Sequence, residues 1–194
     1  MAEHMTWAFI HLSINTNPDV DRVEMEYFGN RLLICGTDTV EGGCNVAKYL
    51  VEEENCTRIE LCGGWHADGA ELIAKAINNR IPVGHVEYLP SEFPKMTKED
   101  NQYVPWAFLS LTGGTDKEVR HIVVPHGKNR LLIYITGTIE KGCEVARQIV
   151  DTGCELVELG GGYGSEGAQR IIDSIDGRVP VGHMVYPDTE LADC

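Results

Sequence analysis

The sequence predicts an α/β protein of two tandem repeats, each a small mixed sheet with strand-helix-strand-helix-strand units, packed as a pseudo-two-fold dimer. Two observations indicate the duplication: the motif WAF at residues 7–9 returns at 106–108, and PVGH at 82–85 returns at 180–183. A third indicates the fold class, because apolar runs of strand length alternate with runs of helical spacing in both copies. Positions kept in both copies are therefore candidates for shared structure or a shared site.

The first part of each repeat is expected to form three strands. Residues 7–14 and 106–111 are apolar and prone to β-structure. Each copy then has a strand–turn–strand segment, over 23–35 and 122–135, with glycine and asparagine in the turn. These segments predict two strands joined by a turn in each copy.

The later part of each repeat alternates helices and strands. Thr39 and Thr138 each precede a run of helical spacing and are candidate N-caps. The order favours parallel strands joined by crossover helices. We expect first helices over 40–51 and 139–150, short strands over 58–62 and 156–159, second helices over 68–78 and 166–176, and closing strands over 83–88 and 181–186.

The repeats define the expected domain organisation. Repeat 1 is predicted over residues 5–89 and repeat 2 over 106–188. Residues 90–105 lie outside the repeat, are polar and are bounded by prolines, so they are predicted to be a linker. Residues 191–194 are expected to be a frayed tail.

Composition limits the classes of partner. Sixteen Lys and Arg against thirty Asp and Glu give a net charge of −14, which repels nucleic acids and anionic membranes but not an anion in a local pocket. No apolar run approaches the roughly 18 residues of a membrane span, and no secretory signal is evident. Seven cysteines without a C-x-x-C motif predict reduced thiols in the cytoplasm and no zinc site. We expect no cofactor, and a homo-oligomer is compatible with the sequence.

A glycine-rich loop after the short strand is the strongest local signal. Such a loop, between a strand and a helix N-terminus, presents backbone N–H groups that can hold phosphate or carboxylate. Tight turns and close packing explain the glycines equally well, and the aromatic residues could line a ligand pocket or simply pack. Residues 162–167 match G-x-G-x-x-G, but copy one lacks the middle glycine, so a dinucleotide site is not favoured. The candidate ligand-binding residues are Gly63, Gly64, Trp65, His66, Gly161, Gly162, Tyr163 and Gly164.

A carboxylate inside each short apolar strand is the second signal. A buried carboxylate needs a partner, and the closing strand offers a histidine at the matching place in each copy. The candidate pairs, Glu60 with His85 and Glu158 with His183, could act as catalytic general bases or as structural hydrogen bonds.

Copy one carries two further reactive side chains at its loop. Cys62 beside a helix N-terminus could be an activated thiolate, but copy two has Gly160 there, which favours a packed thiol. A metal site from His66, His85 and Glu60 is conceivable, but the spacing matches no metal motif, so we predict none.

At these motifs the sequence resembles a family of small bacterial and archaeal α/β proteins of unassigned function. The shared elements are AFI near the start, ELCGG followed by an aromatic residue, and a closing PVG, at residues 8–10, 60–65 and 82–84 of copy one. The resemblance covers nearly all of both repeats and implies a compact α/β fold with no established activity. Copy two departs from the pattern at Gly160, which weakens the case for a shared catalytic thiol.

The sequence favours a cytosolic protein that binds a small anionic metabolite at one or both glycine loops. If it is an enzyme, the residues suit cofactor-independent isomerase or lyase chemistry. The histidines would then exchange protons, the glutamates would orient them, and loop amides would hold an oxyanion. The alternative is a non-catalytic module for assembly, in which the loops are turns and the Glu–His pairs are packing elements.

Overall fold

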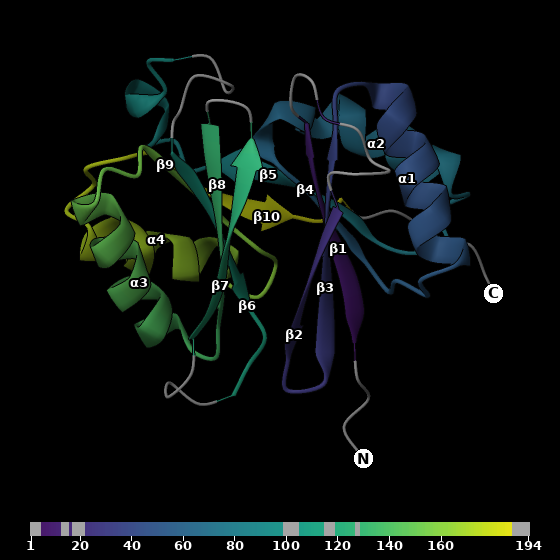
Figure 1. Ribbon diagram of the computed structural model, residues 1–194. Helices are drawn as coiled ribbons and strands as arrows, with labels where there is room; N and C mark the ends of the chain where they lie inside the picture. The colour runs from purple at the N-terminus through teal and green to yellow at the C-terminus, as the bar shows by residue number, and fades with distance from the viewer. Residues whose placement is uncertain are drawn as a thin grey trace. The chain divides into compact units, whose positions relative to one another are not determined.

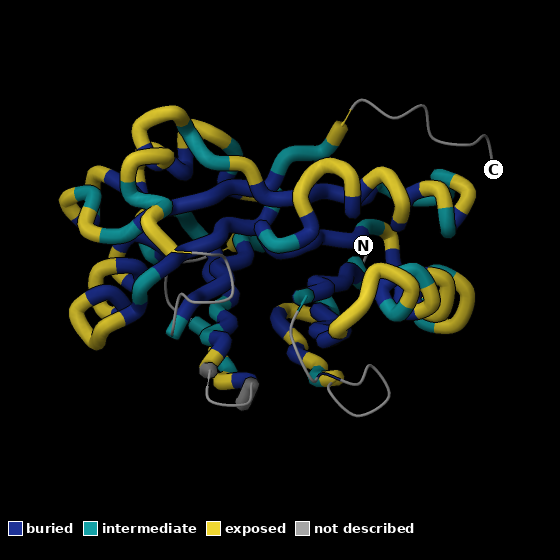
Figure 2. The backbone as a smooth tube through the Cα atoms, turned by 90° about the horizontal axis from the view of Figure 1, so that it is seen from above, coloured by how far each residue is buried: buried dark blue, intermediate teal, exposed yellow. Residues whose placement is uncertain are grey.

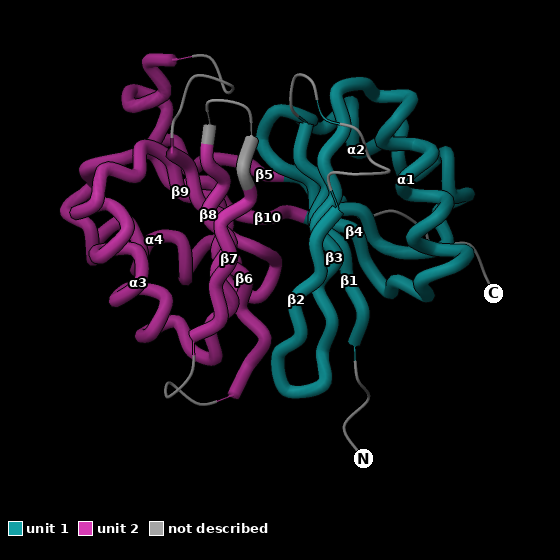
Figure 3. Tube along the Cα trace, in the orientation of Figure 1, with its two compact units in different colours: residues 1–85, 186–194 teal, residues 86–185 magenta. Residues whose placement is uncertain are grey.

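A computed structural model describes residues 5–12, 16, 22–98, 105–114, 119–126 and 129–187. The chain forms two compact units (Figure 1, Figure 3). Unit 1 comprises residues 1–85 and 186–194, and unit 2 comprises residues 86–185. Several predicted segments fall partly on residues outside those described: the first strand at 13–14, the linker at 99–104, the turn of the second strand–turn–strand segment at 127–128, and the repeat 2 end and tail at 188–194.

Unit 1 is a mixed sheet with two α-helices. Its elements are β1 (Thr6–Leu12), β2 (Arg22–Tyr27), β3 (Asn30–Thr37), α1 (Val40–Glu52), β4 (Ile59–Leu61), the 3-10 helix η1 (Gly63–Trp65), α2 (His66–Ala76) and β5 (Val83–Tyr88). The strand order is β2-β3-β1-β4-β5. β3, β1, β4 and β5 are parallel, and β2 is an antiparallel edge strand.

Unit 2 repeats this plan. After the 3-10 helix η2 (Phe93–Lys95) come β6 (Trp106–Leu111), β7 (Val119–His126), β8 (Asn129–Thr136), α3 (Ile139–Asp151), β9 (Leu156–Leu159), α4 (Gly164–Ser174) and β10 (Val181–Val185). The order is β10-β9-β6-β8-β7, with β7 antiparallel to β8 and the other pairs parallel. Both second helices begin two residues earlier than the sequence pattern predicts.

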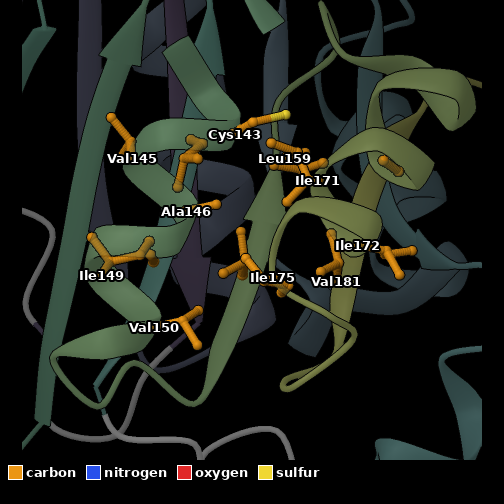
Figure 4. Close-up of a cluster of buried hydrophobic side chains, with 14 of the residues drawn as sticks. Cys143, Val145, Ala146, Ile149, Val150, Leu159, Ile171, Ile172, Ile175 and Val181 are labelled. Carbon is orange, nitrogen blue, oxygen red and sulfur yellow. The ribbon is translucent and has the colours of Figure 1, made fainter. Parts of the chain in front are cut away.

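Each helix pair lies on one face of its unit's sheet (Figure 1). In unit 2 this face holds a buried cluster to which strands and helices both contribute (Figure 4). Residues of the opposite face, such as Phe108 and Leu131, are fully buried as well. Burial therefore follows the strands, while exposed positions gather on helices and turns (Figure 2).

The first helix of each unit begins at a threonine cap, as predicted. Thr39 Oγ1 accepts a hydrogen bond from Gly42 N at 3.0 Å, and Thr138 Oγ1 accepts one from Lys141 N at 3.1 Å. An N-terminal helix N–H lacks an intrahelical acceptor, so each threonine satisfies one that would otherwise need water.

A glycine in each first helix lets an aromatic ring approach its backbone. A Cβ at Gly43 would clash with the Trp65 ring, and one at Gly142 would clash with the Tyr163 hydroxyl. The absent side chain therefore makes room for the ring that follows the glycine loop, and this contact joins the loop to the helix.

The compact units do not coincide with the sequence repeats. Residues 86–88 of β5 belong to unit 2, where Val86 and Tyr88 lie against Gly182. Tyr186, which follows β10, belongs to unit 1. Each unit is thus completed by residues from the closing segment of the other repeat.

The predicted linker begins with an ordered anchor. Glu92 is fully buried; one carboxylate oxygen accepts a hydrogen bond from Val181 N at 3.0 Å, and the other pairs with Lys95 Nζ at 2.7 Å. A buried carboxylate is tolerated when a charge and a hydrogen-bond donor compensate it. The start of the linker is therefore attached to β10 rather than being a plain connector.

Replacing the glycine under the aromatic ring should destabilise the protein. Alanine usually favours a helix over glycine by about 1 kcal/mol, but in Gly142→Ala the new methyl group meets the Tyr163 hydroxyl. We expect the free energy of unfolding in urea to fall by about 1–3 kcal/mol. Tyr163→Phe in the same chain should recover part of the loss, so a double-mutant cycle checks the cause. A stabilised Gly142→Ala would contradict this account.

Candidate functional site

The register of the parallel strands separates the predicted Glu60–His85 pair. Strands β4 and β5 are neighbours, as the sequence predicts, but Leu61 is the partner of His85 and Glu60 is the partner of Gly84. Partnered residues of adjacent strands share a face and consecutive residues alternate. Glu60 and His85 therefore point to opposite faces of the sheet, and the predicted pairing is wrong.

The same correction applies to copy two. His183 is the partner of Leu159, and Glu158 is the partner of Gly182. Leu159 belongs to the cluster beneath α3 and α4, so His183 lies on the helix-covered face. Glu158 lies on the opposite face, together with its β6 partner Phe108.

Glu60 is held by a tyrosine and an arginine. Its carboxylate is fully buried, accepts a hydrogen bond from Tyr186 Oη at 2.7 Å and lies 3.2 Å from Arg58 Nε. Burial is the main cause that raises the pKa of Tyr186 far above its ordinary value, and the nearby charge of Glu60 is the second. The Tyr186 hydroxyl therefore stays protonated and donates the hydrogen bond. Tyr186 thus has the role that the sequence predicts for His85, which is to form a hydrogen bond with Glu60.

Glu158 has the equivalent tyrosine but no equivalent arginine. Tyr88 Oη lies 3.4 Å from its carboxylate, a long hydrogen bond, and Leu156 occupies the position of Arg58. Both tyrosines could have been found from the sequence, because Tyr88 and Tyr186 are 98 residues apart, like the PVGH motif. The sequence does not show, however, that these tyrosines lie beside the glutamates, because that depends on the strand register.

The face of unit 1 that carries Glu60 and Phe9, here called the Phe9 face, gathers several other polar side chains. Strand alternation places His11 on it, and Phe9 and His11 have stacked rings 6.4 Å apart. Copy two has Ser110 at the position of His11. Unit 1 therefore holds chemical groups on this face that unit 2 lacks, and sequence reasoning missed Arg58, His11 and Tyr186 among them.

The aromatic residues of the glycine loops are packing residues. Trp65 is 3% exposed and its Nε1 donates to Ile10 O at 3.1 Å. Tyr163 is 4% exposed, its hydroxyl is hydrogen-bonded to Thr136 Oγ1 at 2.7 Å, and burial raises its pKa well above the ordinary value. Neither ring is available to a ligand arriving from solvent, which corrects their assignment as ligand-binding residues.

The glycines of the two loops serve different purposes. A Cβ at Gly162 would lie 2.7 Å from Leu111 O, so packing requires glycine there. A Cβ at Gly64 would find its nearest neighbours, Cys62 Sγ and Leu12 Cβ, at 3.9 and 4.0 Å. Among the described residues, steric packing therefore explains Gly162 but does not explain Gly64. The first glycines also differ, because Gly63 is buried and Gly161 is half-buried.

His66 adopts a backbone conformation that suits glycine. Its φ is 53° and its ψ is −178°, a region that side chains rarely enter. The matching residue, Gly164, has φ 59° and meets no such penalty. The exposed His66 thus replaces a glycine at the start of α2, at a cost in backbone strain of order 1–3 kcal/mol.

The cysteines of the described residues are free thiols. Burial raises the pKa of Cys35 and of Cys56 to about 12, which keeps both protonated at neutral pH. Cys62 is 5% exposed, and its sulfur accepts a hydrogen bond from Leu12 N at 3.3 Å. These surroundings are those of packed side chains.

Two surface hollows of unit 2 have linings that include no residue of its glycine loop. One in unit 2, of about 490 Å³, lies between α3 and α4 and is lined by Cys143, Arg147 and Arg170 among others. Another, of about 470 Å³, is lined by Lys95, Lys98 and Arg178 among others. Over the part of the chain that the structure describes, no group of His, Cys, Asp and Glu is arranged to hold a metal ion. No helix there is long and apolar enough to cross a membrane.

Removing the tyrosine hydroxyl that contacts Glu60 should lower the free energy of unfolding more than removing the one that contacts Glu158. Tyr186→Phe deprives a fully buried carboxylate of its shorter hydrogen bond, so we expect a loss of about 1–3 kcal/mol in the free energy of unfolding. Tyr88→Phe is the matched control and should cost less, because its bond is 0.7 Å longer (3.4 against 2.7 Å). Urea unfolding of both variants measures the difference, and equal losses would be evidence against it.

His183 should make stability depend on pH. Burial lowers its pKa below the ordinary 6.5, while the charge and backbone carbonyl of Glu87 act in the opposite direction. His183 thus binds a proton more readily in the unfolded chain than in the folded one. Its contribution to the free energy of unfolding is therefore complete above pH 6.5 and is lost as the pH falls through the folded-state pKa. An NMR titration should place the midpoint below 6.5, and His183→Gln should flatten the pH dependence of unfolding. A midpoint at or above 6.5 would refute the assignment.

Comparison with known proteins identifies a family. The model of the Family of unknown function (DUF6506) matches residues 5–101 and again residues 104–193. No curated protein and no solved structure matches. The double match confirms the resemblance inferred from the ELCGG and PVG motifs. The chain therefore belongs to the family of unknown function DUF6506 and carries its domain twice.

Proposed function

We propose that this chain binds a small anionic metabolite at the glycine loop of unit 1, residues 63–66. The observation that carries the proposal is the contrast between the two loops. Gly64 is glycine although packing leaves room for a side chain, and His66 is a side chain although its backbone favours glycine. Both departures are understandable if a ligand approaches the Gly64 backbone and contacts His66.

The position of this loop suits an anion. It follows the carboxyl end of β4 and leads through η1 into α2, a helix of eleven residues. The first N–H groups of such a helix and its dipole attract negative charge. They provide a local attraction that the net charge of −14 does not cancel at short range.

Unit 2 is expected to have lost this function, or never to have had it. Its second glycine is required by Leu111, and its Gly164 relieves the strain that His66 bears. Packing and backbone conformation thus account for both glycines, and one working site per chain is the simpler proposal. The reduced thiols suit a cytoplasmic location.

The strand register does not support acid–base catalysis by Glu–His pairs. The register places the two members of each pair on opposite faces of the sheet, so neither glutamate can orient its histidine. The Glu–His pairs therefore do not support isomerase or lyase action.

A non-catalytic assembly module is the alternative function. It is favoured by the burial of Trp65 and Tyr163 at equivalent places, which shows that part of each loop serves packing. In this alternative the Glu–Tyr contacts are structural. The duplication would then serve pseudo-two-fold packing of the repeats, which stays a prediction.

A thermal-shift screen against sugar phosphates, nucleotides and dicarboxylates tests the proposal. A ligand at 100 times its Kd stabilises the folded chain by about 2.7 kcal/mol, an easily measured rise in Tm. Gly64→Ala should leave the Tm without ligand nearly unchanged but remove the rise, because the methyl group occupies the approach to the backbone. His66→Gly should weaken the response while relieving strain.

Gly162→Ala is the matched control in unit 2. It should lower the Tm, because its Cβ meets Leu111 O, and it should keep the ligand response. No response to any of these anions, or a response that persists in Gly64→Ala, would overturn the proposal and favour the assembly module.

A further inference from the structure

The start of the linker forms a hollow with unit 2. Residues 95, 97 and 98 line it together with residues from the end of α3, the turn between α3 and β9, and the segment before β10. Its volume is about 470 Å³, within the roughly 300–1,000 Å³ of small-molecule sites. The linker lies between the two repeated segments, so the duplication of the fold does not explain its two lysines here.

The lining of this hollow is basic although the protein is acidic. Three cationic side chains line it, those of Lys95, Lys98 and Arg178, whereas Glu155 is the single carboxylate among its described lining residues. The whole chain has the opposite balance, with sixteen Lys and Arg against thirty Asp and Glu. A local excess of cations in a chain of net charge −14 indicates a site for an anion.

Lys95 is fixed in place beside Arg178. Its Nζ pairs with the buried carboxylate of Glu92 at 2.7 Å, and the other oxygen of Glu92 accepts a hydrogen bond from Val181 N. A Cβ at Gly177 would lie 3.1 Å from the same Nζ, and Arg178 is the next residue. The buried anchor of the linker therefore holds an ammonium group next to a guanidinium group.

Arg178 is held by two contacts that leave one guanidinium nitrogen over. Its Nε donates to Ile175 O at 3.0 Å and its Nη1 pairs with Asp151 at 2.6 Å, whereas Nη2 has no acceptor among the described residues. The side chain is 41% exposed, so a ligand can reach it from solvent. Arg80, the matching residue of unit 1, makes equivalent contacts. The arginine thus serves the fold in both units, and the linker lysines are what unit 2 adds.

We propose that this hollow binds an organic phosphate, with the phosphate group at the three cations and an apolar group over Val150, Val179 and Pro180. These three apolar residues line the same hollow. A phosphate monoester carries about −1.5 to −2 charges at neutral pH, so it engages more than one cation at once. The site lies in unit 2 and does not depend on the function proposed for the glycine loop of unit 1.

The ion pairs already present are weak competitors for these cations. Lys98 pairs with Glu155 at 2.6 Å, but 40% and 37% of the two side chains are exposed, and the Asp151 partner of Arg178 is 63% exposed. Exposed ion pairs contribute little free energy, because water solvates both partners well. A dianion can therefore replace the two carboxylates, which then remain in water.

Amide NMR signals of the intact chain test this site with phenyl phosphate as the probe. The signals of Gly153, Glu155 and Val179, which line the hollow, should shift saturably. Inorganic phosphate lacks the apolar group and should bind at least about tenfold more weakly. Phenol lacks the charge and should leave these signals unmoved at the same concentration.

Lys98→Ala is the test variant, because an exposed side chain can be shortened without disturbing the core. Loss of one charged contact should weaken phenyl phosphate binding at these signals at least about tenfold. Lys75→Ala is the matched control and should leave the affinity unchanged, since Lys75 is an exposed lysine paired with a glutamate on α2 of unit 1. Gly64→Ala, which blocks the glycine loop, should also leave it unchanged.

Several outcomes would overturn the proposal. Signals of the hollow that phenyl phosphate does not move would show that no site exists there. An affinity that Lys98→Ala leaves unchanged, or that Lys75→Ala lowers equally, would refute the role of the linker lysine. Phenol binding as tightly as phenyl phosphate would refute the anionic class of ligand. Shifts that disappear in Gly64→Ala would assign the binding to the glycine loop instead.

Discussion

A parallel sheet with helices on one face obliges every strand to sort its side chains between two different environments. The side-chain period of two leaves no freedom in this sorting, since a shift of one residue would exchange the faces. In both units the register pairs the histidine of the closing strand with a leucine and the glutamate with a glycine. Everything that distinguishes the two faces, including which polar groups can meet, follows from that register.

The consequence is that each buried glutamate has its tyrosine partner at the end of the closing segment of the other repeat. Tyr186 reaches Glu60, and Tyr88 lies beside Glu158. A buried carboxylate is tolerated only when hydrogen bonds or opposite charges replace its water. The exchange of closing segments between the units is therefore coupled to the electrostatics of the buried face.

The aromatic residue after each glycine pair has a structural task that leaves the rest of the loop adaptable. Trp65 and Tyr163 fill the space above Gly43 and Gly142 and so attach the loop to the first helix. With that contact kept in both copies, the neighbouring positions have diverged. Unit 1 has a histidine in a strained conformation, while unit 2 has Gly164 and a loop explained by packing.

The sequence by itself determined the duplication, the alternation of strands and helices, and the threonine caps, because these depend on local periodicity and on residues next to one another in the chain. It also identified the buried glutamates, since a carboxylate in an apolar strand is visible without coordinates. It could not determine their partners. Register shifts of one residue leave the apolar pattern of a fully buried strand unchanged, so only tertiary structure decided that Glu60 meets Tyr186 rather than His85. For the same reason the room around Gly64 became visible only when the loop and the strands were brought together in space.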